Sequence, residues 1–414
     1  MTAVSPSASA AATRGHALRA LVASALGYAM DGFDLLMLGF MLPAISADLH
    51  LSGAQAGALV TWTLVGAVAG GIGFGLLSDC YGRVRVLTWT ILLFAVFTGM
   101  CALARGYADL LVYRTIAGIG LGGEFGIGMA LVAEAWPARL RARASSYVGL
   151  GWQLGVLAAA LLTPLLLPVI GWRGMFAIGL LPAVVSFVVR RRVEEPGLFV
   201  AHAQRVAMAG RSERPRALRL LVADAPTARA SLGVAVLCSV QNFGYYGLMI
   251  WLPAYLAKSF GYSLTKSGLW TAATVAGMAV GIWLFGVAAD RFGRRPAFLF
   301  YQVGAVIMVF VYAQLSTPCA LLVGGAAMGV FVNGMIGGYG ALISELYPTA
   351  ARATAQNVLF NIGRAVGGFG PLAVGALAAR YSFTAALGML AAIYVLDILA
   401  TLFLIPERRG ATLE

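Results

Sequence analysis

Apolar runs recur along the whole chain and are separated by short clusters of glycine, proline and charged residues. Each run is long enough to cross a hydrocarbon core about 30 Å thick, which takes about 20 residues of helix. In the first half of the chain the runs predict six membrane-spanning helices, at 20–44, 55–77, 86–104, 109–134, 144–168 and 174–189. In the second half they predict six more, at 231–257, 267–289, 296–315, 318–344, 354–379 and 383–405. The pattern therefore predicts an all-α integral membrane protein with twelve transmembrane helices.

The two sets of predicted helices repeat one another. The segment GLLSDCYGR at residues 75–83 returns 211 positions later as GVAADRFGR at residues 286–294. At the same offset, EAWPARLR at residues 134–141 returns as ELYPTAAR at residues 345–352. Internal repeats of this kind are typical of transporters built from two related halves. We therefore predict two pseudo-symmetric six-helix bundles.

One long polar segment, at 190–229, separates the predicted bundles and holds nine arginines. The opposite side of the membrane would carry only five basic residues, which are Arg105, Arg173, Lys258, Lys266 and Arg380. Because cytoplasmic loops carry the excess of lysine and arginine, we predict a multi-pass protein of the bacterial inner membrane with both termini cytoplasmic. The predicted domains are an N-terminal tail (1–19), an N-terminal bundle (20–189), a cytoplasmic linker (190–229), a C-terminal bundle (230–405) and a C-terminal tail (406–414).

Composition excludes several other classes of protein. The chain is 60% hydrophobic and 11% charged, which does not suit a soluble domain. The first apolar run is long and carries two aspartates, unlike a cleavable signal peptide, so we expect it to be a retained helix. Its net charge of +13 comes from residues near helix ends rather than from one basic face, so we expect no nucleic-acid partner. The four cysteines have no metal-ligand spacing, and the three histidines lie in loops or at helix ends. We therefore expect no enzyme activity, no cofactor and no metal, and a monomer in the lipid bilayer.

Two acids fall within the first predicted helix. Asp31 and Asp34 are three residues apart, so they share a helix face near the middle of the membrane. An isolated charge there costs several kcal/mol, and neighbouring carboxyls favour reversible protonation. We predict that both couple transport to protons. The alternative is a structural pair bonded to the helix backbone or to an arginine.

Arg114 and Arg364 are the two basic residues placed inside predicted helices, and each needs an anion because arginine keeps its proton. The anion could be a substrate carboxylate, which the planar guanidinium binds bidentately. It could instead be a permanent partner such as Asp34, Glu124 or Asp397. Glu124 is predicted either as a second proton-coupling site or as the partner of Arg364, while Asp397 is interpreted as structural.

Neutral polar residues add to the candidate site. Neutral hydrogen bonds and flat surfaces suited to an organic acid come from Gln241, Asn242, Tyr245, Tyr246 and Asn333, although helix packing is the favoured interpretation for any one of them alone. Glycines at 118–123 match the Gly-x-Gly-x-x-Gly spacing of dinucleotide-binding proteins. That fingerprint requires a preceding strand, so inside an apolar helix we interpret it as close helix packing.

The repeated loop segments supply candidate gating residues. A carboxylate at the membrane boundary can accept hydrogen bonds from a helix N-terminus and pair with arginine, which would hold neighbouring helices in one conformation. The alternative is that these charges only orient the protein in the membrane. The candidates are Asp79, Arg83, Glu134, Asp290, Arg294 and Glu345.

These features resemble the major facilitator superfamily over nearly the whole chain. Asp31-Gly-Phe-Asp34, Tyr113-Arg114, and Gly363-Arg364 before Gly367-Gly368 are similar to the aromatic-acid:proton symporters. The segments Gly122 to Pro137 and Gly171-Trp172-Arg173 are more similar to the sialate:proton and other organic-acid symporters. Cys80 departs from the pattern, since arginine usually occupies its position.

The resemblance implies a transporter that moves a small carboxylate together with protons by alternating access. An exporter of drugs or metabolites, driven by protons, would share the fold and the loop segments. A membrane sensor that transports nothing is a further alternative, although no soluble signalling domain fits between the predicted helices.

Overall fold

A computed structural model describes residues 6–180, 184, 187, 191, 193–209, 217–261 and 264–413. Throughout these residues the regular structure is helical. The N-terminal half contains α1 (Pro6–Asp48), α2 (Gly53–Tyr81), α3 (Arg83–Cys101), α4 (Tyr107–Gly122), α5 (Glu124–Ala135) and α6 (Arg141–Ile178). A short 3₁₀ turn, Ala138–Leu140, precedes α6. Within the predicted linker lie α8 (Gly197–Ala209) and α9 (Ala217–Leu220).

The C-terminal half repeats this order. It contains α10 (Ala225–Phe260), α11 (Leu264–Phe292), α12 (Arg294–Tyr312), α13 (Pro318–Gly334), α14 (Ile336–Leu346), α15 (Arg352–Gly367), α16 (Gly370–Arg380) and α17 (Phe383–Leu404). In the described residues, eleven helical stretches are long and apolar enough to cross a membrane. The spans predicted at 109–134, 318–344 and 354–379 each consist of two consecutive helices, α4–α5, α13–α14 and α15–α16.

The observed helix bounds differ from the predicted ones in three ways. α1 begins at Pro6, inside the stretch predicted as a tail. Two of the breaks that split predicted spans fall at paired glycines, 122–123 and 367–368, and the second glycine of each pair keeps backbone angles of the α region. α6 continues past 168 to Ile178 with non-helical backbone at Gly171, and seven of the sixteen residues predicted as a helix at 174–189 lie outside the described residues.

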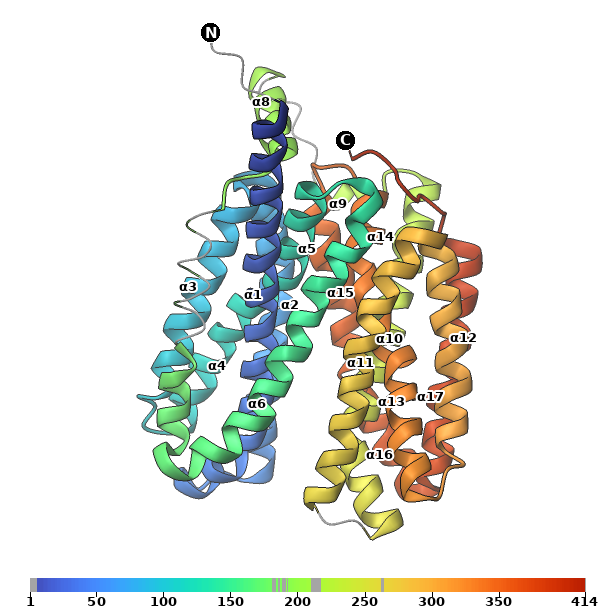
Figure 1. Ribbon diagram of the computed structural model, residues 1–414. Coiled ribbons are helices and arrows are strands. Elements are labelled where there is room, and N and C mark those ends of the chain that lie inside the picture. The colour runs from blue at the N-terminus through green and yellow to red at the C-terminus, as the bar shows by residue number, and fades with distance from the viewer. Residues whose placement is uncertain are drawn as a thin grey trace.

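The two halves lie side by side (Figure 1). The start of α1, α8, α9 and the C-terminal tail gather at one end of the molecule, here called the termini face (Figure 1). α6 and α11 run along the boundary between the halves and pack on each other. The helices of the two halves diverge toward the opposite end (Figure 1).

Glycines bring helices together where a side chain would not fit. A Cβ added at Gly122 in α4 would lie 1.8 Å from the carbonyl oxygen of Ala67 in α2, and one at Gly118 would lie 2.1 Å from that of Thr63. The Gly-x-Gly-x-x-Gly spacing is therefore a helix-packing surface, as predicted.

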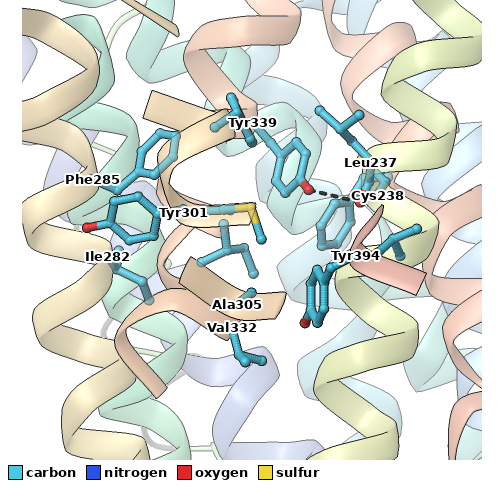
Figure 2. Packing of buried hydrophobic residues seen from close by; sticks show 14 of the residues in the cluster. Leu237, Cys238, Ile282, Phe285, Tyr301, Ala305, Val332, Tyr339 and Tyr394 are labelled. Carbon is cyan, nitrogen blue, oxygen red and sulfur yellow. Dashed lines mark hydrogen bonds between the residues drawn. The ribbon is translucent and has the colours of Figure 1, made fainter. Parts of the chain in front are cut away.

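The C-terminal half has an aromatic core. Phe285, Phe298 and Tyr301 form edge-on or steeply inclined ring contacts, and Tyr339 joins them. Figure 2 shows Phe285 and Tyr301 on one side of Tyr339, and Cys238 and Tyr394 on the other. The Tyr339 hydroxyl donates to the carbonyl of Leu237. This interior holds the helices that carry half of the candidate site in fixed positions.

Candidate functional site

A small cavity lies between the two halves. α1 and α6 contribute Tyr28 and Trp152 from one half, and α10, α13, α14 and α15 line it from the other. The space open to the centre of a water-sized sphere is about 10 Å³, close to the volume that one water molecule needs. The complete lining is Tyr28, Trp152, Gln241, Asn242, Tyr245, Tyr246, Asn333, Ile336, Phe360 and Arg364.

Arg364 is the charged residue of this cavity. Its side chain is 3% exposed, interacts with the Tyr246 hydroxyl and lies over the Phe360 ring. Within the described part of the chain, no carboxylate lies within ion-pair distance of it, and its Nε has no hydrogen-bond partner. In this structure Arg364 therefore does not form the ion pair with Asp34, Glu124 or Asp397 that was the alternative. The guanidinium can bind an anion that enters the cavity.

Gln241 and Asn333 form an amide pair in the cavity wall. The Gln241 amide nitrogen donates to Asn333 Oδ1 at 2.8 Å, which leaves Gln241 Oε1 and Asn333 Nδ2 without partners. The pair therefore offers one acceptor and one donor, and exchanging oxygen and nitrogen in both amides preserves that property. Tyr245 accepts a hydrogen bond from Trp152 Nε1 at 3.2 Å, across the boundary between the halves.

Aromatic rings surround the polar groups. Phe125 stacks on Phe360 across the halves with ring centroids 3.7 Å apart, and Tyr28 contacts both Phe125 and Trp152. Tyr28, Trp152 and Phe360 were not among the predicted site residues. Only Tyr28 had a usable signal, since it lies three residues before Asp31 and shares its helix face.

Arg114 and Asp34 form a bidentate ion pair inside the N-terminal half. Arg114 Nη1 and Nη2 lie 2.9 and 2.6 Å from the two carboxylate oxygens of Asp34, and both side chains are buried. Thr63 lies 3.4 Å from Arg114 Nε. Arg114 does not line the cavity. In this structure it therefore follows the alternative in which its anion is a partner within the protein, Asp34, rather than a substrate.

The other two predicted proton-coupling acids have different surroundings. Asp31 is 1% exposed and lies within electrostatic reach of Tyr28 and Tyr246, two cavity residues. Glu124 is the first residue of α5 and accepts a hydrogen bond of 2.6 Å from the Thr90 hydroxyl of α3. It is thus held by α3 and is not the partner of Arg364.

The first group of predicted gating residues joins the two halves near the termini face. Asp79, near the end of α2, accepts hydrogen bonds from the backbone N–H groups of Ala353 (3.2 Å) and Thr354 (2.8 Å) in the first turn of α15. Arg83 lies 2.9 Å from Asp79 and 3.0 Å from Glu134. Glu134 also pairs with Arg352 of the other half at 2.8 Å.

The second group is the pseudo-symmetric counterpart. Asp290, in α11, accepts hydrogen bonds of 3.1 Å from the backbone N–H groups of Ala142 and Arg143 in the first turn of α6. Arg294 lies 3.1 Å from Asp290 and 2.7 Å from Glu345. Glu345 pairs with Arg141 of the N-terminal half at 2.8 Å. All six predicted residues therefore lie in two buried clusters that connect the halves, here called the gate clusters.

Two acids that the sequence analysis did not select complete these clusters. Glu195 accepts hydrogen bonds from the backbone N–H groups of Arg83 and Arg85, at 2.7 and 3.0 Å. Glu407 does the same for Arg294 and Arg295, at 3.2 and 2.8 Å. Both cap helices that start just after a glycine with φ near 110°, a conformation that favours glycine. The sequence could have indicated these two acids by their position, because each follows the last predicted span of its half.

Similar proteins are known along nearly the whole chain. A Haemophilus influenzae protein, named for metabolite transport, is 66% identical over 399 residues, 96% of this chain and 98% of its own. A Cupriavidus pinatubonensis protein, named for 4-methylmuconolactone transport, is 33% identical and covers 94% of this chain and 90% of its own. The cis,cis-muconate transport protein of Acinetobacter baylyi is 29% identical over 92% of both chains.

The fold also matches a solved structure. The proton:xylose symporter XylE, bound to 6-bromo-6-deoxy-D-glucose, superposes with a TM-score of 0.80, covers 97% of this chain and 98% of its own, and is 19% identical. At that identity the likeness describes the fold. The family model of the Major Facilitator Superfamily matches residues 24–270 and 234–413. The chain is therefore a multi-pass membrane transporter, not an enzyme, and belongs to the Major Facilitator Superfamily.

Proposed function

We propose that this protein is a proton-coupled symporter that imports a small organic anion, an aromatic or other unsaturated carboxylate, by alternating access between its two halves. It acts as a monomer in the bacterial inner membrane, with both termini in the cytoplasm. The two relatives named for 4-methylmuconolactone and cis,cis-muconate transport support this class of substrate. The positive-inside pattern supports the orientation.

The observation that carries the proposal is the position of Arg364. A buried guanidinium without a carboxylate partner is costly, and an anion that enters the cavity removes that cost. Because the cavity lies between the halves, the bound anion is held by both and can be released to either side as they move. A carboxylate suits this residue because it accepts two parallel hydrogen bonds from the planar guanidinium.

The rest of the cavity supports a flat substrate with a second polar group. Once the halves move apart enough to admit the substrate, Tyr28, Trp152 and Phe360 offer ring surfaces on which an aromatic or conjugated body can stack. The amide pair of Gln241 and Asn333 offers a free acceptor and a free donor, which fits a hydroxyl or a carbonyl at the other end of the substrate.

Proton coupling is assigned to Asp31 and Asp34. Asp31 lies near the cavity through Tyr28 and Tyr246, and Asp34 holds Arg114 bidentately. Protonation of Asp34 would weaken that pair and free Arg114, so proton binding and rearrangement of α1 against α4 are linked. Taking up a proton together with an anion also lowers the net charge that must cross the low-dielectric interior. Glu124 is assigned as an accessory proton site held by Thr90.

The gate clusters are assigned the role of holding the cytoplasmic side closed. Their ion pairs and helix-capping bonds join α2 to α15 and α11 to α6, and these contacts must break for that side to open. In this conformation substrate would therefore enter from the face opposite the termini.

The test uses purified protein and proteoliposomes. Arg364→Gln should abolish the thermal stabilisation that cis,cis-muconate or benzoate gives to the wild-type protein, because the main contact for the carboxylate is gone. Asp31→Asn should abolish uptake driven by a pH gradient while preserving that stabilisation. Neutral analogues, such as the matching amides, serve as controls that neither variant should affect.

Two results would contradict the proposal. If Arg364→Gln is stabilised by these acids as strongly as the wild type, Arg364 does not bind the substrate. If Asp31→Asn accumulates substrate at the wild-type rate under a pH gradient, the coupling assignment is wrong. Loss of a compound from loaded vesicles under an opposing gradient, with no uptake, would favour the exporter alternative.

A further inference from the structure

A second buried acid lies in the interior of the C-terminal half, away from the cavity. Asp397 is 0% exposed, sits on α17 and is not among the residues that line the cavity. Tyr394 and Thr401 share its helix face, one turn before and one turn after it, and both are buried. α17 packs against α12, α10 and α16, so this face points into the core of the bundle.

The groups around Asp397 are polar but neutral. Gln302 of α12 donates from Nε2 to the Thr401 hydroxyl at 2.8 Å, and its amide lies beside the Asp397 carboxyl without forming a hydrogen bond of ordinary geometry. Cys238 of α10 and Tyr339 of α14 lie within electrostatic reach. Figure 2 shows Cys238, Tyr339 and Tyr394 gathered in this part of the core.

No cation balances the carboxyl in the part of the chain that the structure describes. α10 presents Cys238, α14 presents Tyr339 and α17 itself presents Tyr394. The arginines of α12, Arg294 and Arg295, stand at its first turn, and Arg294 is bound to Asp290 and Glu345. α16 carries its charge at Arg380, which is exposed at the end of the helix.

Several buried polar atoms here have no hydrogen-bond partner in the heavy-atom geometry. They are both carboxylate oxygens of Asp397, Gln302 Oε1 and the Tyr394 hydroxyl. A bare carboxylate would leave a charge and two acceptor oxygens without a hydrogen bond of ordinary geometry in an apolar core. A proton on Asp397 removes that charge and turns one of the two oxygens into a hydrogen-bond donor.

We propose that Asp397 is a proton-binding site of the C-terminal half, separate from the transport pathway, which holds a proton in the folded protein and stabilises the packing of α17 on α12 and α10 in that form. A carboxyl in the unfolded chain ionises near its usual pKa of about 3.9, so above that pH the fold must either take up a proton at Asp397 or hold an unbalanced charge in the bundle core. The stability of the C-terminal half therefore falls as the pH rises, whether or not substrate is present.

The experiment compares melting temperatures of purified wild-type protein and Asp397→Asn from pH 4 to pH 9.5, without substrate. Near pH 4 the two should melt within a few degrees of each other, because the unfolded carboxyl, with its usual pKa of about 3.9, is then also largely protonated and the amide mimics the neutral acid. As the pH rises the wild type should fall below Asp397→Asn by several degrees. Asp397→Glu retains a titratable acid and should keep this loss at higher pH, while Asp224→Asn, at an exposed helix cap, should not remove it.

Every outcome bears on the proposal. Parallel curves for wild type and Asp397→Asn would overturn it. A melting temperature that rises with sodium in the wild type but not in Asp397→Asn would make the site a metal-cation site instead. If Asp397→Asn folds but loses pH-driven uptake, the proton belongs to the transport pathway. If Asp397→Asn does not fold, Asp397→Thr provides the neutral comparison. Its melting temperature should likewise not fall as the pH rises.

Discussion

The two halves of the molecule differ in whether their buried charged groups are paired within the protein. In the N-terminal half Arg114 is bound to Asp34 by two hydrogen bonds, so positive and negative charge balance in this conformation. In the C-terminal half Arg364 faces the cavity and Asp397 lies in the core, and neither is paired with the other or with another charged side chain of the described residues. The same fold thus contains one closed ion pair and two buried groups that each need a partner from solution.

Under the proposed function, this difference assigns a different role to each half. A closed pair such as Asp34 and Arg114 changes only when a proton arrives, so it suits coupling. An open guanidinium such as Arg364 changes when an anion arrives, so it suits substrate binding.

The largest effect is expected from Asp34→Asn. Removing one member of the closed pair leaves Arg114 buried and unbalanced, which typically costs about 3–5 kcal/mol. We expect a large fall in melting temperature and no pH-driven uptake. The double variant Asp34→Asn with Arg114→Met should regain most of the stability but none of the coupling. Equal melting temperatures for the wild type and the single variant would show that the pair contributes little.

A smaller effect is expected when both gate clusters are weakened. In the double variant Glu134→Gln with Glu345→Gln, the paired arginines lose their shared acids, which should shift the population toward an open termini face by about 1–3 kcal/mol. Spin labels at Cys80 and at an introduced cysteine replacing Arg291 lie in opposite halves, and the distance between them should lengthen.

The distance measurement requires that no other cysteine is labelled and that a control variant keeps the gate clusters intact. Cys319 is exposed and is replaced by serine, while Cys101 and Cys238 are buried. Glu194→Gln, at an exposed position of the linker next to Glu195, is the matched control. An unchanged distance distribution in the double variant would remove the gating role from both glutamates.

The amide pair should contribute less. Asn333→Leu removes the free donor and leaves Gln241 without its partner, so acids with a second polar group should bind about 10-fold more weakly, a loss of about 1.4 kcal/mol. Benzoate, which lacks such a group, should bind nearly as before, and 4-hydroxybenzoate provides the comparison in the same thermal-shift assay. Equal losses for the two acids would mean that the pair only packs the cavity wall.

The smallest effect is expected at Asp224, which contrasts with Asp397 in the same half. Asp224 caps α10 by accepting a hydrogen bond from the Thr227 N–H at 2.7 Å, and this bond lowers the pKa of its carboxyl. Since the folded state favours the charged form, the stabilisation is present above the usual aspartate pKa of about 3.9 and is lost as the pH falls through the lowered pKa. The melting temperatures of wild type and Asp224→Ala should therefore converge in acid, the opposite sign to Asp397.

Much of the fold followed from pattern alone. Apolar runs about 20 residues long predict spans because lipid offers no partner for a backbone amide, and all the described spans fall where runs were found. The repeated segments at 75–83 and 286–294 identified both gate clusters, since equivalent positions in two related halves meet equivalent neighbours. Helix breaks were harder to predict, because a glycine pair inside an apolar run is compatible with a straight helix.

The residue types of the candidate site could be predicted from the sequence, but the contacts between these residues could not. The sequence by itself determined that Asp31, Asp34, Arg114 and Arg364 are ionisable groups within apolar helices, and that such groups need partners. Only the tertiary structure decided that Arg114 meets Asp34, that Glu124 meets Thr90 and that Arg364 faces a cavity lined by both halves. The reason is physical: periodicity determines which face of a helix a side chain occupies, whereas its partner lies on another helix, whose rotation and distance depend on packing throughout the bundle.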